Sequence, residues 1–96
     1  MVVGILQVEL KIDGARSLKD KRRVVASLKD RLHQQHQVSV AEIEQQDNPR
    51  VARLGVAAVS SQVGHCQGVL ERVVKKIRTT RGCVLADHAT EILTGY

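Results

Sequence analysis

The first twelve residues constrain the fold more than any other stretch of this chain, because their side chains follow a period of two. An extended backbone puts two rows of residues on opposite faces: Val2, Gly4, Leu6, Val8, Leu10 and Ile12 against Val3, Ile5, Gln7, Glu9 and Lys11. The first row is almost wholly apolar, which is typical of a half-buried strand. Asp13-Gly14 then gives a turn signal. We therefore predict a strand over residues 2–12.

The rest of the chain alternates between strand and helix patterns. Residues 38–45, 53–60 and 83–93 predict three more strands, and the turn-forming residues 46–49 separate the first two of these. Helical periodicity predicts helices at about 18–35 and 62–79. The order βαββαβ indicates an α+β fold of ferredoxin-like type, with an antiparallel four-stranded sheet and two helices on one face. We expect a single ferredoxin-like domain over residues 1–96.

The most basic stretch, SLKDKRRVVASLKDRL at residues 17–32, contains the tetrapeptide SLKD twice. Ten helical residues turn the second copy about 80° away from the first, so the copies form no functional repeat. Ser17 is typical of an N-cap, and Asp20 completes a pattern close to a capping box. Lys21 falls on the apolar side of the helix, and we expect its amine to reach solvent or a carboxylate. The apolar stripe itself comprises Leu18, Val25, Leu28 and Leu32.

The net charge of +5 and the isoelectric point near 9.7 favour anionic partners. The basic helix has two interpretations: a solvated face balanced by Asp20 and Asp30, or an anion site where residues 14–17 enter the helix. The segment lacks the Gly-Lys-Ser/Thr of a Walker loop. The phosphate contacts that we predict are Arg16, Ser17, Lys19, Lys21, Arg22, Arg23 and Lys29, with Arg50 and Arg53 as auxiliary contacts.

Composition excludes several classes of function. Tyr96 is the sole aromatic residue, which excludes mechanisms that stack bases on aromatic side chains. Cys66 and Cys83 are too few for a disulfide framework and are typical of a reducing cytoplasm. The first residues lack the basic region of a signal peptide, and no apolar run approaches the ~20 residues of a membrane span. We expect a cytoplasmic protein without a membrane partner.

No set of residues defines a catalytic or metal site. His33 and His36 have no further ligands at a matching spacing, and we expect no metal and no cofactor. Residues 64–72, GHCQGVLER, resemble the acylphosphatase signature at Gly64, Gln67, Gly68, Val69 and Arg72. In that family the motif follows the first strand, whereas here it follows the third. A core-facing helical stripe explains the segment without catalysis: Cys66, Val69, Leu70, Val73, Val74 and Ile77. We predict no catalytic residues.

Three blocks of the sequence resemble the YlxP-like family of small bacterial cytoplasmic proteins: GARSLKDKRRVVASLKDRL, VSVAE and LGVAAVSS. The resemblance extends over essentially the whole chain. It implies a ferredoxin-like fold, and it implies a link to RNA or ribosomes, because the family shares its gene neighbourhood with translation-initiation and ribosome-maturation factors. It brings no catalytic residues with it.

The sheet face away from the helices is expected to be apolar. Four residues on the first and third strands would form a homo-oligomer interface there: Val3, Ile5, Ala57 and Val59. We therefore predict a non-enzymatic cytoplasmic protein that binds RNA or a ribosomal subunit through phosphate contacts of its basic helix. The alternative is a self-assembling protein-interaction module with no nucleic-acid role. An acylphosphatase-like hydrolase comes third.

Overall fold

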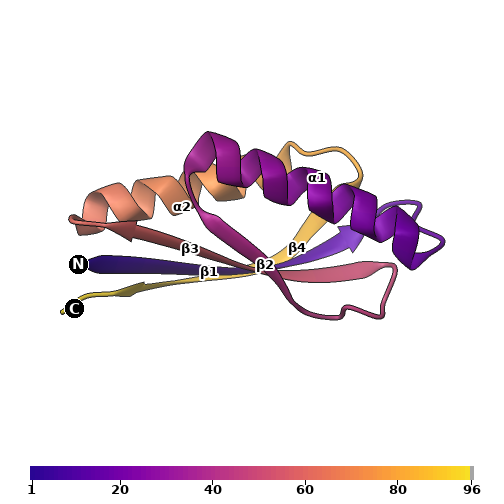
Figure 1. Cartoon of the computed structure of the whole chain (residues 1–96), viewed down its shortest axis with the longest axis horizontal. Helices are drawn as coiled ribbons and strands as arrows, with labels where there is room; N and C mark the ends of the chain where they lie inside the picture. The colour runs from indigo at the N-terminus through magenta and orange to yellow at the C-terminus, as the bar shows by residue number, and fades with distance from the viewer. Residues whose placement is uncertain (96) are drawn as a thin grey trace.

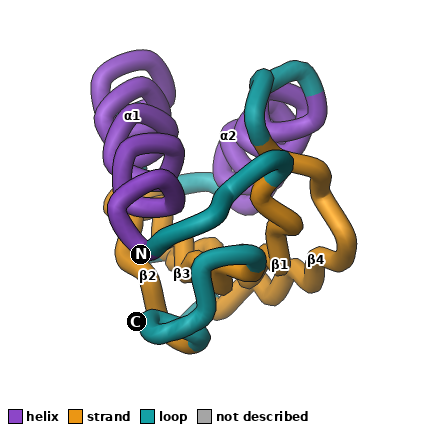
Figure 2. Tube along the Cα trace, turned by 90° about the vertical axis from the view of Figure 1, so that its right-hand side faces the viewer, coloured by secondary structure: helices purple, strands orange, loops and turns teal. Residues whose placement is uncertain are grey.

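The computed structural model describes residues 1–95 and has the predicted order of elements, βαββαβ. The elements are β1 (Val2–Ile12), α1 (Leu18–His36), β2 (Ser39–Glu44), β3 (Val51–Ser60), α2 (Val63–Arg78) and β4 (Cys83–Leu93). The strands form one antiparallel sheet in the order β2-β3-β1-β4. Both helices cover the same face of the sheet, as the sequence predicts (Figure 2). The fold is therefore ferredoxin-like.

The period of two in β1 decides which face of the sheet is buried. Val2, Leu6, Val8, Leu10 and Ile12 are buried under the helices, and the odd-numbered residues face the other way. The same alternation holds in β3, where the even-numbered residues 52–58 are buried. The predicted stripes of the helices complete the core with Val25, Leu28, Leu32, Cys66, Val69, Leu70, Val73 and Ile77. The core thus lies between the helices and one face of the sheet.

Gly4 is where β1 and α2 approach most closely. A Cβ atom at this position would lie 2.5 Å from the Cys66 sulfur and 2.8 Å from Cδ1 of Leu70. Both neighbours are fully buried, so neither can easily move aside. The missing side chain of Gly4 therefore lets Cys66 pack directly onto the strand. This explains the cysteine as a small core residue, as predicted.

The two helices run in opposite directions and are displaced from each other along the sheet (Figure 1). α1 begins over one end of the sheet and α2 over the other, and the C-terminal end of α1 lies beside α2. The loop after α2 then reaches α1, where Gly82 lies against Val24. We call the strip where the two helices adjoin the helix seam; it is lined by Gln35, His36, Arg72 and Lys76.

Among residues 1–95, neither helix is long and apolar enough to cross a bilayer.

Candidate nucleic-acid interface

Charge is distributed unequally between the helices and the rest of the chain. The two helices carry ten of the fifteen lysines and arginines but only three of the ten acidic residues. The strands and loops carry the other five cations and seven acids, so they are net acidic. We call the outer surface of α1 and α2 the helical face. Its excess of positive charge makes it the natural surface for an anionic partner.

On α1, most of the predicted phosphate contacts are available to a partner. The side chains of Arg16, Lys19, Arg22 and Arg23 are exposed, and that of Lys29 is half-buried. None belongs to the buried stripe of the helix. The amphipathic pattern therefore placed these five cations correctly on the outside.

The entrance of α1 differs from the predicted anion site, because the protein's own carboxylate occupies it. Ser17 caps the helix through its hydroxyl oxygen, which accepts from the backbone N–H of Asp20 at 3.3 Å. The Asp20 carboxylate in turn accepts from the N–H of Arg16 at 3.0 Å. These reciprocal bonds confirm the predicted cap. A phosphate here would meet the negative charge of Asp20, so Ser17 is a capping residue and the prediction of an anion site at residues 14–17 is corrected.

The prediction that Lys21 contacts phosphate is also wrong, because its side chain is completely buried. Its ammonium group lies 2.8 Å from the carboxylate of Glu42. It also donates to three carbonyl oxygens, of Gln45 at 2.6 Å, Val51 at 3.2 Å and Gln46 at 3.4 Å. The prediction that it reaches a carboxylate is confirmed. Lys21 joins the first turn of α1 to the β2–β3 loop and has no donor left for a ligand.

Neither predicted auxiliary contact belongs to the helical face. Arg53 alternates with the buried residues of β3 and so lies on the opposite face of the sheet, where it pairs with Glu9 at 3.6 Å. Arg50 is exposed in the β2–β3 loop, where its backbone N–H donates to the side chain of Asn48. The sheet separates Arg53 from the helices, so a phosphate contact by Arg53 stays a prediction and would lie apart from the helical face.

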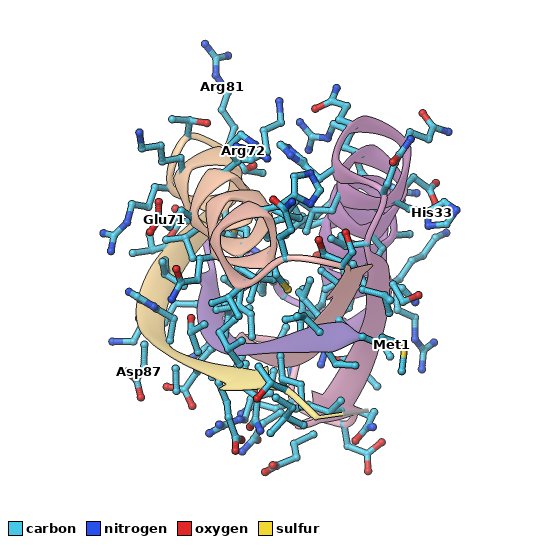
Figure 3. All side chains as sticks on the ribbon, turned by 90° about the vertical axis from the view of Figure 1, so that its left-hand side faces the viewer. Met1, His33, Glu71, Arg72, Arg81 and Asp87 are labelled. Carbon is cyan, nitrogen blue, oxygen red and sulfur yellow. The ribbon has the colours of Figure 1, made fainter. Side chains whose placement is uncertain are left out.

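The helical face includes cations on α2 that the sequence analysis did not select. His65, Gly68, Arg72 and Lys76 follow a spacing of three or four residues, and this stripe turns toward α1. In Figure 3 Arg72 rises from α2 on the side of α1, whereas Glu71 points away over β4. Beside His36 of α1, Arg72 and Lys76 form a positive cluster. The spacing within α2 was visible in the sequence, but its position beside α1 was not.

The pKa of His36 reflects the burial and the positive charges of the helix seam. Its pKa is lowered from 6.5, first because burial disfavours the charged ring and then because the positive charges of Arg72 and Lys76 repel a further proton. Two small hollows lie on this seam, of about 220 and 340 Å³. Histidine, arginine, lysine and glutamine side chains line them, with no carboxylate among the lining residues.

A larger groove of about 600 Å³ lies on the other side of α2, against the edge strand β4. Leu70, Val74 and Ile92 form its apolar floor, and its polar rim includes both signs of charge. The Arg78 guanidinium lies 3.4 Å from the ring nitrogen Nε2 of His88 across the groove. Asp87 points out of this groove on the far side of β4 (Figure 3).

The sheet face opposite the helices, which we call the open sheet face, collects the four residues predicted as an oligomer interface. Val3 lies directly across from Val59, and Ile5 across from Ala57. Val59 is 66% exposed. Ile43 of β2 folds over Gly55 beside them, and an apolar hollow of about 430 Å³ runs between these residues and β1. The expected sharing of one face is therefore confirmed.

Comparison with known sequences places residues 3–90 in a described family, "Protein of unknown function (DUF503)". "Uncharacterized protein YlxP" of Bacillus subtilis (strain 168) is 36% identical over 73 residues, which cover 76% of this chain and 79% of that protein. These matches confirm the resemblance found in the sequence.

Solved structures resemble the chain in fold alone. Protein Atu4242 from Agrobacterium tumefaciens superposes with a TM-score of 0.56 at 14% identity, covering all of this chain and 94% of that one. A de novo designed protein with a ferredoxin fold gives a TM-score of 0.51 at 11% identity, over 97% of this chain and 84% of its own. An antibiotic biosynthesis monooxygenase gives 0.52 at 11% identity, over 100% and 99% of the two chains. Identities this low carry no information about activity.

Proposed function

The chain belongs to the DUF503 family, and from the structure we propose that it is a non-enzymatic protein that binds RNA or a ribosomal particle through its helical face. The observation that carries the proposal is the segregation of charge, with ten cations on the two helices against three acids. The contacts are electrostatic and directed at phosphates, which position a protein on a nucleic acid without reading its sequence.

Six exposed or half-buried residues on the helices form the proposed contact surface: Lys19, Arg22, Arg23, Lys29, Arg72 and Lys76. Arg16 extends this surface just before α1. Residues 1–95 include no aromatic side chain, so the described part of the open sheet face offers none on which bases could stack as they do in RNA-recognition motifs. Ribosomal RNA is the first partner to test, because the resemblance to the YlxP-like family implies a link to translation.

The experiment is a titration of the protein with ribosomal RNA and with isolated small subunits at several salt concentrations. Contacts to about five phosphates predict that affinity falls by roughly 10²–10³-fold between 50 and 200 mM salt. Replacing Arg22→Gln and Arg23→Gln together should reduce the slope of log affinity against log salt by about 2, because two phosphate contacts are lost.

The matched control removes the same charge from the opposite face. Lys11 is exposed on the open sheet face and Arg53 lies on it, so Lys11→Gln with Arg53→Gln also lowers the net charge by two. This variant should keep the wild-type salt slope. No binding at low salt, or an equal loss in both double variants, would contradict the proposal.

A second candidate function is self-association through the open sheet face. The exposed Val59 beside Val3, and the apolar hollow next to Ile5, favour it, because contiguous apolar patches of this kind usually mark interfaces. A second copy of this chain would leave both helical faces outward. Sedimentation of wild type against Val59→Lys tests it: a wild type that remains monomeric at all concentrations rules the candidate out, and RNA binding should be unchanged in either case.

The position of residues 64–72 does not favour an acylphosphatase-like activity, which is the third alternative. Residues 64–72 lie inside α2, where most backbone amides are engaged within the helix and do not form a cradle for a phosphate. If acyl phosphate hydrolysis is observed, Arg72→Ala should leave it unchanged. The two free, buried cysteines fit a cytoplasmic location for the proposed function.

A further inference from the structure

We propose that the helix seam is a specific site for one phosphate group, held by Arg72 and Lys76 of α2 and His36 of α1. In the proposed function, on which this inference rests, the phosphate belongs to the RNA backbone. A free phosphate ion has the same chemistry, and the experiment below separates the two sources.

The first argument is the unusual grouping of like charges. Arg72 and Lys76 both lie close enough to His36 to disfavour its protonation, so three nitrogen-bearing side chains converge from two helices. Clusters of cations are costly unless an anion balances them. The hollows beside them are lined by Gln35, His65 and these same side chains, and no acidic residue contributes to the lining. The seam therefore offers donors and positive charge without a counter-ion from the protein.

The second argument is that the helix makes room for the guanidinium group of Arg72. A Cβ atom on Gly68 would lie 3.2 Å from Nη1 of Arg72 and 3.9 Å from its Cζ. The exposed Arg72 side chain thus folds back along the helix over the glycine. Its planar guanidinium presents paired N–H donors, the geometry that suits phosphate oxygens.

The third argument is that the neighbouring acids point elsewhere. Glu71 lies on the same turn of α2 as Arg72, but it projects over β4, on the far side of the helix from the seam (Figure 3). Asp20, the acid at the start of α1, is engaged at the opposite end of that helix, where it accepts from Arg16. The seam therefore differs from the entrance of α1, where the Asp20 carboxylate already occupies the position that an anion would take.

The test begins with inorganic phosphate at constant ionic strength, followed by NMR of the His36 ring. Wild-type protein should show a saturable shift of these signals. Arg72→Ala should weaken phosphate binding about tenfold or more, as expected for a lost charge-assisted hydrogen bond. The matched control is Arg78→Ala, which removes the same charge from α2 but on the side of His88. It should bind phosphate as wild type does.

Gly68→Ala provides a second variant that does not remove any charge. The new methyl group would displace the Arg72 guanidinium, so phosphate affinity should fall while the helix keeps its fold. Absence of a saturable shift in wild type would overturn the proposal. Equal losses in Arg72→Ala and Arg78→Ala would overturn it too, because binding would then depend only on total charge.

The RNA arm separates this inference from the proposed function. Arg72→Gln should lower the salt slope of RNA binding by about 1, and RNA should shift the same His36 signals as phosphate. If the Arg22 and Arg23 variants reduce the slope but Arg72→Gln does not, RNA binding stands and the seam is overturned as its phosphate site. If phosphate saturates the seam but RNA does not bind, the site takes free phosphate and the proposed function fails.

Discussion

The helical face and the open sheet face of this small protein differ in what they offer a partner. The helical face is strongly positive, and its cations have few acidic neighbours. The open sheet face combines exposed valine and isoleucine side chains with an ion pair between Arg53 and Glu9. The first face favours an anionic partner, which it attracts at long range and in a salt-dependent way. The second face favours an apolar partner, which it binds through short-range contacts.

The difference between the faces shows that the position of a charge matters more than its presence in a basic segment. Lys21 and Arg22 are adjacent in the sequence, but one is completely buried and the other exposed. Glu9 neutralises Arg53 on the sheet, whereas no acid lines the seam beside Arg72. Net charge alone would have assigned all four to one surface.

The largest expected effect distinguishes structural from surface cations. Lys21→Met should lower the free energy of unfolding by about 3 kcal/mol, because it leaves Glu42 without its counter-charge and the carbonyl oxygens of Gln45 and Val51 without their donor. Urea denaturation measures this. Lys19→Met, an exposed neighbour on the same helix, should change stability by less than about 0.5 kcal/mol. Equal stabilities of the two variants would show that the buried contacts of Lys21 contribute nothing net.

The next effect concerns the core that separates the two faces. Gly4→Ala should destabilise the protein by about 2 kcal/mol, since the added methyl group would collide with Cys66 and Leu70. Gly64→Ala is the control, because a Cβ at that position meets nothing within 4 Å. Thermal unfolding should show a lowered midpoint for Gly4→Ala only. A similar drop in both variants would mean that the close approach of β1 and α2 is not the cause.

A smaller effect separates stability from binding on the helical face. Gly68→Ala should raise the free energy of unfolding by up to about 1 kcal/mol, because alanine is the better helix former and the obstructing Arg72 side chain is flexible. The same variant should bind phosphate and RNA more weakly. Chemical denaturation and the binding titration measure the two quantities on one protein. A variant that is both more stable and an equally good binder would show that the placement of Arg72 is unimportant.

The smallest effect is the pH dependence contributed by His36. Its folded-state pKa lies below the unfolded value of 6.5, so the unfolded chain takes up a proton before the folded one does. The contribution of His36 to stability is therefore full above pH 6.5 and is lost as pH falls through 6.5 toward the lower folded pKa. NMR titration should show this lowered pKa. Arg72→Ala should move the pKa part of the way back, and bound phosphate should raise it; an unchanged pKa in Arg72→Ala would contradict the assigned repulsion.

Sequence patterns predicted the elements within one or two residues, because periods of two and of 3.6 are local properties. They also gave the N-cap at Ser17, which depends on residues only three positions apart. The candidate interface was predicted less completely. Lys21 and the anion site at the start of α1 were misassigned because the first depends on a distant partner and the second on a competing carboxylate.

The sequence by itself determined the ferredoxin-like order of elements and the side of each strand that enters the core. Only the tertiary structure decided which cations remain free. The displacement of α1 along α2 brings His36 beside Arg72 across 36 positions of the chain, and the β2–β3 loop encloses Lys21 with carbonyl oxygens. Such contacts follow from the packing of whole elements, and no local periodicity encodes them.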